Sequence, residues 1–200
     1  TKITWTEQAA RIGNAATENE NDKGWNASFR IQAKDDFIGG NMIPTNGADS
    51  GIYLIAAETM INIEETLAAV DAAASVCDLP IMCTMTVEAD GSIFSGGNAV
   101  EAAVSLEAAG ADAVGINCSV GPDQLVSVVR NIKENVSIPV IAKPNAGMPV
   151  IDEKGNAVYS MNAEEFAHHM KVLIENGASV VGGCCGTTPS FIKALHDTIR

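Results

Sequence analysis

Two stretches of the chain, EAAGADAVGINC at 107–118 and IENGASVVGGCC at 174–185, share one pattern. Each starts with the last turn of a helical segment, turns at a glycine, and continues into a short apolar run that finishes in cysteine. A helix that stops at glycine and leads into a buried strand is part of a βα repeat. Because the pattern occurs twice, it favours a repetitive α/β fold.

Three more apolar, β-branched runs precede or separate these two. All five runs are apolar at both alternating sets of positions, which is typical of parallel strands that are buried on both faces. The expected strands are GIYLIAAETM (51–60), LPIMCTMTV (79–87), ADAVGINC (111–118), IPVIAKPN (138–145) and ASVVGGCC (178–185).

Helices are predicted between the strands, with capping boxes at Asn98 with Glu101 and at Asn162 with Glu165. Five βα units predict a parallel sheet, which is either doubly wound or closed as a (β/α)8 barrel. The repeated pattern favours the barrel, but eight units need about 250 residues. We therefore predict an incomplete (β/α)8 TIM-barrel type, with about five recognisable βα units and the first strands shortened or replaced.

The first fifty residues do not fit the repeat and are left as an unassigned segment, 1–50, ahead of the barrel part, 51–200. Within this segment we expect a polar helix at about 5–17 and a strand near 27–33. The chain starts at Thr1 without a methionine and stops at Arg200, at the end of a predicted helix, so we expect it to be part of a longer protein.

Composition narrows the classes of partner. The net charge of −13 would repel nucleic acid and anionic membrane surfaces, which leaves small metabolites as the expected partners. The sequence has no apolar run of the length that spans a bilayer and no signal segment, so we predict a cytoplasmic protein. An odd number of cysteines, five, fits reduced thiols or metal ligands better than a disulfide framework.

Polar residues and cysteines gather where the predicted strands end: Glu58, Cys118, Asn145, Cys184 and Cys185. In a parallel sheet or barrel these ends form one rim, where active sites lie. Three thiolates around zinc leave one tetrahedral position open, as in a catalytic zinc site. The alternative for each cysteine is burial as a small apolar residue, which we expect for Cys77 and Cys83.

Adjacent side chains on a strand point to opposite faces, so Cys184 and Cys185 can share a metal only if the backbone bends between them. We expect Gly182, Gly183 and Gly186 to supply that freedom.

Four motifs are similar to those of the homocysteine S-methyltransferase family: ETM (58–60), GINC (115–118), PNAG (144–147) and GGCCGTTP (182–189). The resemblance implies that Cys118, Cys184 and Cys185 hold a catalytic Zn²⁺ and that homocysteine sulfur takes the fourth position. It also implies that Glu58 binds the homocysteine ammonium. Asn145 matches the family's asparagine beside the metal, a candidate oxygen ligand when substrate is absent. The family's opening Asp-Gly-rich segment has no counterpart in this sequence.

Three functions stay open at this point. The first is a zinc-dependent homocysteine S-methyltransferase that makes methionine, with methylcobalamin on another module, betaine or S-methylmethionine as the methyl donor. The second is a truncated, catalytically impaired module that binds zinc or a partner chain that completes the barrel. The third is a phosphate-binding barrel enzyme with incidental cysteines, in which GGCCGTTP (182–189) would hold an anion at a helix N-terminus.

Overall fold

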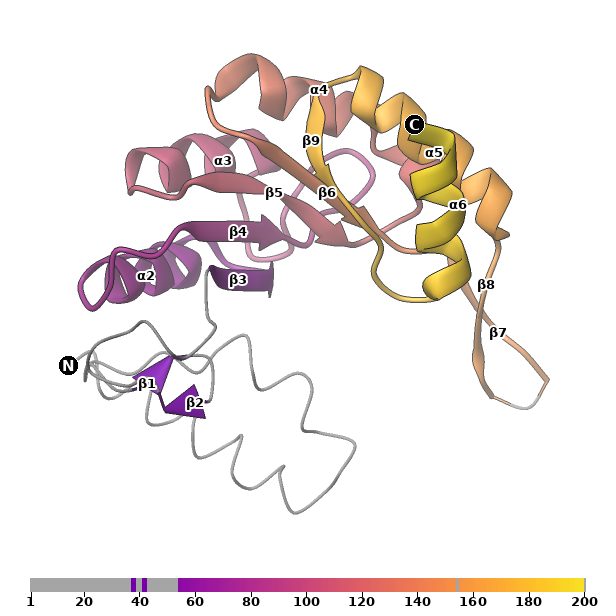
Figure 1. Ribbon diagram of the computed structural model, residues 1–200, viewed down its shortest axis with the longest axis horizontal. Helices are drawn as coiled ribbons and strands as arrows, with labels where there is room; N and C mark the ends of the chain where they lie inside the picture. The colour runs from indigo at the N-terminus through magenta and orange to yellow at the C-terminus, as the bar shows by residue number, and fades with distance from the viewer. Residues whose placement is uncertain (1–36, 39–40, 43–53, 154, 200) are drawn as a thin grey trace.

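The computed structural model describes residues 37–38, 41–42, 54–153 and 155–199, shown in Figure 1. The helix and strand expected at 5–17 and 27–33 lie outside the described residues. The strands are β1 (Phe37–Ile38), β2 (Asn41–Met42), β3 (Ile55–Met60), β4 (Ile81–Met85), β5 (Ala113–Cys118), β6 (Val140–Pro144), β7 (Pro149–Ile151), β8 (Ala157–Tyr159) and β9 (Ala178–Val181). The helices are α2 (Ile63–Ala74), α3 (Ala99–Ala108), η3 (Pro122–Gln124), α4 (Val126–Asn135), α5 (Ala163–Glu175) and α6 (Pro189–Ile199).

The main sheet has five parallel strands in the order β3-β4-β5-β6-β9, so each strand pairs with the next one of the sheet along the chain. Because βα crossovers are right-handed, connections that always step in the same direction put their helices on the same face. This topology is that of a barrel wall and not of a doubly wound sheet. The predicted fold, an incomplete barrel of five βα units, is confirmed.

The helices begin where the sequence predicts. Asn98 Oδ1 accepts hydrogen bonds from the backbone N–H groups of Val100 and Glu101 at 3.0 and 3.1 Å, and the Asn98 N–H donates to the Glu101 carboxylate at 3.1 Å. Asn162 and Glu165 form the same capping box at the start of α5. At 13 residues α5 is the longest described helix, and none of the described helices is long and apolar enough to cross a bilayer.

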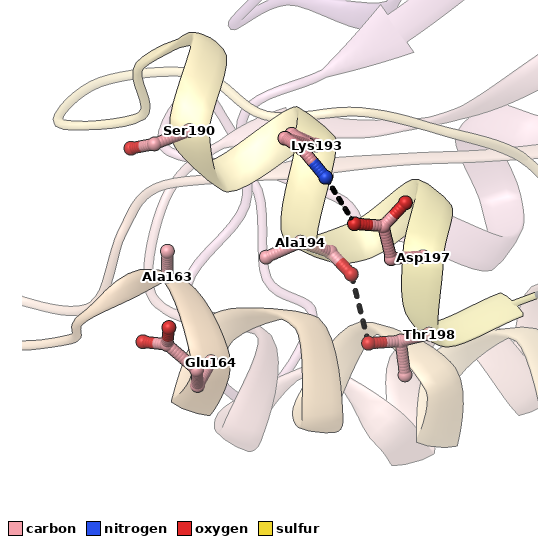
Figure 2. Close-up of a pocket in the computed structure, with 7 residues that line it drawn as sticks. All are labelled: Ala163, Glu164, Ser190, Lys193, Ala194, Asp197 and Thr198. Carbon is pink, nitrogen blue, oxygen red and sulfur yellow. Dashed lines mark hydrogen bonds and ion pairs between the residues drawn. The ribbon is translucent and has the colours of Figure 1, made fainter.

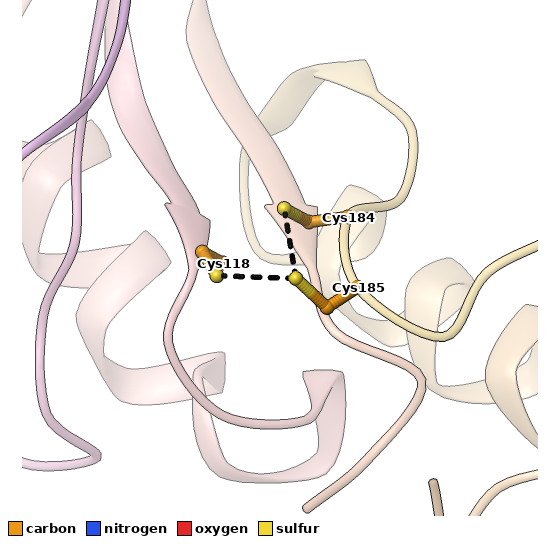
Figure 3. A group of neighbouring side chains, drawn as sticks. All are labelled: Cys118, Cys184 and Cys185. Carbon is orange, nitrogen blue, oxygen red and sulfur yellow. Dashed lines mark hydrogen bonds between the residues drawn. The ribbon is translucent and has the colours of Figure 1, made fainter. Parts of the chain in front are cut away.

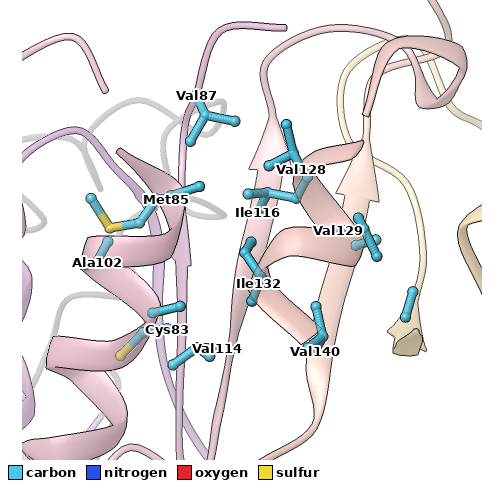
Figure 4. Close-up of a cluster of buried hydrophobic side chains, with 14 of the residues drawn as sticks. Cys83, Met85, Val87, Ala102, Val114, Ile116, Val128, Val129, Ile132 and Val140 are labelled. Carbon is cyan, nitrogen blue, oxygen red and sulfur yellow. The ribbon is translucent and has the colours of Figure 1, made fainter. Parts of the chain in front are cut away.

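The hydrophobic core lies between the sheet and the helices that cover one of its faces, as Figure 4 shows. Side chains at alternate positions of the central strands meet apolar side chains of α3 and α4 there. The fully buried residues at this contact include Cys83, Val114, Val129, Ile132 and Val140. Burial of the Cys83 thiol raises its pKa to about 12, so this cysteine is a core residue, as expected.

The opposite, concave face of the sheet carries polar side chains. Thr84, Asn117 and Lys143 share this face, because strand pairing aligns Thr84 with Gly115 and Asn117 with Lys143. Glu58 of the edge strand β3 also reaches it, through its contact with Lys143. Thr84 and Asn117 are buried, whereas Lys143 and Glu58 are half-buried. The concave face therefore carries the polar and ionisable side chains, whereas the helix-covered face carries the apolar side chains of the core.

The hairpin formed by β7 and β8 is a feature that the sequence analysis missed. Its strands pair antiparallel between β6 and α5, and Figure 1 shows them projecting beyond the sheet. Val150, Ile151 and Val158 of the hairpin are exposed. The hairpin begins just after β6 ends, so it stands at the carboxyl rim of the sheet.

Candidate metal centre

The three cysteines singled out at the strand ends meet at one point of the rim, shown in Figure 3. Cys118 is the last residue of β5, and Cys184 and Cys185 follow the end of β9. The Cys185 sulfur lies 3.7 Å from the Cys118 sulfur and 3.9 Å from the Cys184 sulfur. Among the described residues this is the one group of metal-binding side chains whose ligand atoms all lie within 4.8 Å of one another.

The spacing fits a tetrahedral zinc site. A tetrahedral ion with metal–sulfur bonds of about 2.3 Å places its sulfur ligands about 3.8 Å apart. The two measured sulfur–sulfur separations, 3.7 and 3.9 Å, lie on either side of that value. Three thiolates would fill three positions, so the donor set suits Zn²⁺ with one position left for another ligand.

Cys118 is presented by an unusual backbone. Cys118 and Ser119 both adopt left-handed conformations, with φ of 60° and 69°. Such residues cost on the order of 1–3 kcal/mol each and persist where the surroundings fix them. Here Val87 donates its N–H to Ser119 Oγ at 2.8 Å, and Asn145 Nδ2 donates to the Ser119 carbonyl at 2.8 Å.

The glycines contribute less than expected. Gly186 has a φ of 81°, but Gly182 and Gly183 are not in the left-handed region. A second sharp bend, which was not expected, lies at Cys118 and Ser119, because their positive φ values turn the chain at the end of β5.

Asn145 joins the two cysteine-bearing loops. Its Oδ1 accepts a hydrogen bond from the Cys185 N–H at 3.1 Å, and its Nδ2 donates one to the Ser119 carbonyl. The side chain is buried, with 4% exposed. In this structure Asn145 therefore acts as a clamp between the loops.

Asn117 is a second buried amide at the site. Unlike Asn145, it was not predicted from the sequence. Its Oδ1 accepts hydrogen bonds from the Thr59 N–H at 2.9 Å and the Thr84 hydroxyl at 2.7 Å. Its Nδ2 donates to Thr59 Oγ1 at 2.8 Å and approaches the Cys184 sulfur at 3.8 Å. One side chain thus fixes the ends of three strands and supports a thiolate.

The thiols of Cys118 and Cys184 differ in pKa. Hydrogen bonding by the Cys118 thiol is the main cause that lowers the pKa of Cys184 to about 5, with smaller contributions from Cys185 and Asn117. The same hydrogen bond, together with burial, raises the pKa of Cys118. Cys184 is therefore the thiolate of the cluster near neutral pH, and a thiolate is the form that binds metal.

Glu58 lies on the concave face and contacts Lys143. The Glu58 carboxylate and the Lys143 ammonium form an ion pair, with 31% and 20% of the two side chains exposed. Burial lowers the pKa of Lys143, and the negative potential of Cys184 opposes that shift. Lys143 thus lies between the carboxylate and the sulfur cluster, and nothing in the sequence patterns singled it out.

Tyr159 of the hairpin is the third residue that was missed. Loss of hydration, followed by hydrogen bonding with Cys185, raises the pKa of Tyr159. Its ring packs on Gly186, where an added Cβ would lie 2.3 Å from the ring carbon Cγ. The hairpin therefore reaches the metal centre through this ring.

A separate pocket of about 460 Å³ lies between α5 and α6, shown in Figure 2. It is lined by Glu164 and by the ion pair of Lys193 with Asp197, among others, and contains no cysteine. These side chains are largely exposed, so the pocket has the character of a surface groove.

The family model described as homocysteine S-methyltransferase matches residues 6–199. The chain belongs to the homocysteine S-methyltransferase family.

Relatives in this family share part of their length with the chain. A methionine synthase of Mycobacterium leprae is 38% identical over 118 residues, which are 58% of this chain and 10% of that protein. Homocysteine S-methyltransferase 3 of Zea mays is 32% identical over 158 residues, which are 76% of this chain and 46% of that protein. The chain thus spans about a tenth of the first relative and less than half of the second.

Solved structures of the homocysteine methyltransferase MmuM from Escherichia coli share the fold. The oxidized form superposes with a TM-score of 0.61 at 22% identity, covering 76% of this chain and 47% of that one. The metallated form gives a TM-score of 0.60 at 22% identity, covering 74% and 46%.

Proposed function

We propose that the chain is the homocysteine-binding, zinc-dependent part of a homocysteine S-methyltransferase and that residues 51–200 form the C-terminal part of its barrel. The observation that carries the proposal is the approach of three cysteine sulfurs to within 4.8 Å of one another, with two of their separations at the spacing of a tetrahedral zinc site. Membership of the family supports the substrate, since a homocysteine methyltransferase needs a site for a thiol.

Zn²⁺ bound by Cys118, Cys184 and Cys185 would supply a Lewis acid that keeps the substrate thiol deprotonated near neutral pH. Asn145 and Asn117 hydrogen-bond to the loops that carry the ligands, which supports the close approach of the three sulfurs before a metal binds. Glu58 would accept the substrate ammonium on the concave face. The homocysteine sulfur would then attack the methyl carbon, forming the new S–C bond while the donor leaves with the electron pair of the broken bond.

The methyl donor is part of the proposal. Methylcobalamin carried by another module is the first candidate, because the region similar to the mycobacterial methionine synthases is 10% of those proteins and leaves room for further modules. Betaine and S-methylmethionine are the small-molecule alternatives.

One observation favours a second candidate, an impaired module that needs a partner. In the described part of the chain, β3 and β9 are the edge strands of a sheet that a closed barrel would pair on both sides. The phosphate-binding alternative has no such support, because it leaves the approach of the three sulfurs unexplained.

The test combines metal analysis with ligand binding. Metal content is measured on the purified chain, and homocysteine is titrated by calorimetry before and after zinc is removed by a chelator. We expect one zinc per chain, binding of homocysteine only when zinc is present, and methyl transfer from one of the three donors. Zinc without homocysteine binding would favour the impaired module, and homocysteine binding unaffected by zinc removal would contradict the mechanism.

A further inference from the structure

The ion pair between Lys143 and Glu58 crosses the concave face of the sheet. Glu58 is on β3 and Lys143 on β6, with β4 and β5 between them. Neighbouring strands lie about 4.8 Å apart, so on a flat sheet β3 and β6 would be about 14 Å apart. The contact is made because the sheet curves and both side chains extend over its concave face.

Lys143 lies close to the metal centre, as its neighbours show. Its Cα is paired with that of Asn117, whose amide approaches the Cys184 sulfur. Its aliphatic stem passes Gly182, where an added Cβ would lie 3.4 Å from Lys143 Cγ. The ammonium thus stands on the same concave surface as the sulfur cluster, two residues along the chain from Asn145.

A purely structural role explains this pair poorly. With side chains only 20% and 31% exposed, both groups have lost much of their hydration. The free energy lost by desolvating two charges commonly cancels their attraction, so half-buried ion pairs contribute little net stability. A cation kept beside a carboxylate and a thiolate cluster is better explained by a charged ligand.

We propose that Lys143 determines the specificity of the homocysteine site by binding the α-carboxylate of the amino acid, next to the ammonium held by Glu58. This inference rests on the proposed function, in which Glu58 binds the ammonium. The ammonium and carboxylate of an α-amino acid are attached to one carbon. A cation that contacts Glu58 is therefore within reach of the carboxylate once the substrate ammonium occupies the Glu58 oxygens.

Charge balance supports the same arrangement. Without Lys143 the substrate carboxylate would be placed beside the Glu58 carboxylate and near the cysteine thiolates, and like charges at such distances repel. With Lys143, one ion pair inside the protein is exchanged for two with the substrate. The pair of side chains thus matches a zwitterion, with one group for each of its charges.

The test uses the zinc-loaded chain and three thiols that differ only in their charged groups. Homocysteine carries both charges, 3-aminopropane-1-thiol lacks the carboxylate, and 4-mercaptobutyrate lacks the ammonium. Dissociation constants are measured by calorimetry for the wild type and for Lys143→Met, Lys143→Arg and Lys171→Met. Lys171 is an exposed lysine of α5 and is the matched control for loss of a positive charge.

We expect Lys143→Met to weaken binding of homocysteine and 4-mercaptobutyrate by about tenfold each, the effect of losing one partly buried charge pair. Binding of 3-aminopropane-1-thiol should stay the same or become tighter, because Glu58 is released from Lys143. Lys143→Arg should restore much of the loss, and Lys171→Met should change none of the constants.

Equal effects of Lys143→Met on all three thiols, or no effect on any, would overturn the inference while leaving the proposed function intact. If the wild type binds none of the three thiols, the proposed function fails and this inference fails with it. Zinc content and circular dichroism of each variant separate these results from a loss of folding.

Discussion

Asn145 accepts a hydrogen bond at Oδ1 from the backbone N–H of Cys185 at 3.1 Å, and this contact connects the end of β6 to the loop after β9. The same amide holds Ser119, the residue after the first cysteine of the cluster. One buried side chain thus links Cys118 and Cys185, which come from loops 67 residues apart in sequence, in addition to the backbone hydrogen bonds of Cys184 and Cys185 with the end of β6.

Replacing Asn145 with alanine should loosen the metal centre. The Cys185 N–H and the Ser119 carbonyl would both lose their partner, and an unpaired buried polar group costs about 1–3 kcal/mol. We expect a loss of stability in that range and zinc binding weaker by about tenfold or more. Denaturant unfolding and a competition titration with a chromophoric chelator measure the two effects. Asn145→Asp, which keeps the acceptor but not the donor, should lie between the alanine variant and the wild type; unchanged zinc affinity in both would contradict the clamp.

Serine substitutions should separate the ligands from the other cysteines. Cys118→Ser, Cys184→Ser and Cys185→Ser each remove one sulfur of the cluster and should reduce bound zinc to well below one per chain. Cys83→Ser is the matched control, because it places a hydroxyl in the core instead of at the rim. It should lower the free energy of unfolding by about 1–3 kcal/mol and leave the zinc content of the folded protein unchanged. Metal analysis by mass spectrometry decides between these outcomes.

Thiol reactivity of the metal-free chain should be greatest at Cys184. Its pKa of about 5 means that it is a thiolate at pH 6, whereas an ordinary thiol with a pKa of 9.0 is protonated there. Iodoacetamide should therefore label Cys184 first at pH 6, with the rate falling as the pH drops through 5. Cys83, buried and with its pKa raised, should stay unlabelled.

The variant Cys118→Ala tests the cause of this shift. Hydrogen bonding by Cys118 is the largest contribution that lowers the Cys184 pKa, so its loss should move the pKa back toward 9.0 and slow labelling at pH 6. Peptide mapping by mass spectrometry follows each site. Labelling of Cys184 that is equally fast in the variant would disprove this explanation, and added zinc should protect the wild type.

Two glycines with almost the same φ angle allow a controlled test of the hairpin. Gly186 and Gly155 have φ of 81° and 82°, so alanine at either would have a positive φ, which costs about 1–2 kcal/mol. Only at Gly186 would the new Cβ meet an obstacle, the Tyr159 ring at 2.3 Å, while Gly155 has nothing within 4 Å.

Gly186→Ala should therefore cost more stability than Gly155→Ala and should also weaken zinc binding, because Tyr159 must leave Cys185. Gly155→Ala should leave zinc affinity unchanged. The comparison uses denaturant unfolding and the chelator titration on both variants. If the two glycines gave equal results in both measurements, contact between the hairpin and the metal centre would be unimportant.

The local features of the fold could be predicted from the sequence because each depends on neighbouring residues. The five strands lie within the predicted runs, and both capping boxes form, since Asn98 and Asn162 satisfy the first N–H groups of their own helices. The approach of the three cysteines could also be predicted, because the carboxyl ends of parallel strands lie at one rim of the sheet.

Other parts of the site depend on contacts between distant residues and left no local signal. The sequence around Asn117 predicts only an ordinary strand residue, yet its side chain connects three strand ends by hydrogen bonds. Lys143 follows a buried run and is distinguished only by Glu58, 85 positions earlier in the sequence. The strands of the hairpin have three residues each, too few for an alternating pattern to be recognised.

The bent backbone at Cys118 and Ser119 was not predicted, because left-handed conformations are rare for residues other than glycine. Only the long-range hydrogen bonds of Ser119 with Val87 and Asn145 make it tolerable there.

The edge position of β9 gives the metal centre a mechanical consequence. Within the described sheet, β9 pairs with β6 alone, with an irregular register, so it can detach without breaking the pairing of any other strands. A metal ion bridging Cys118 with Cys184 and Cys185 would act as a crosslink over 67 residues, and crosslinks over long loops restrict the unfolded chain most. Loading the metal would then fasten the C-terminal edge of the sheet, so protection of the β9 amides from hydrogen exchange should report metal occupancy.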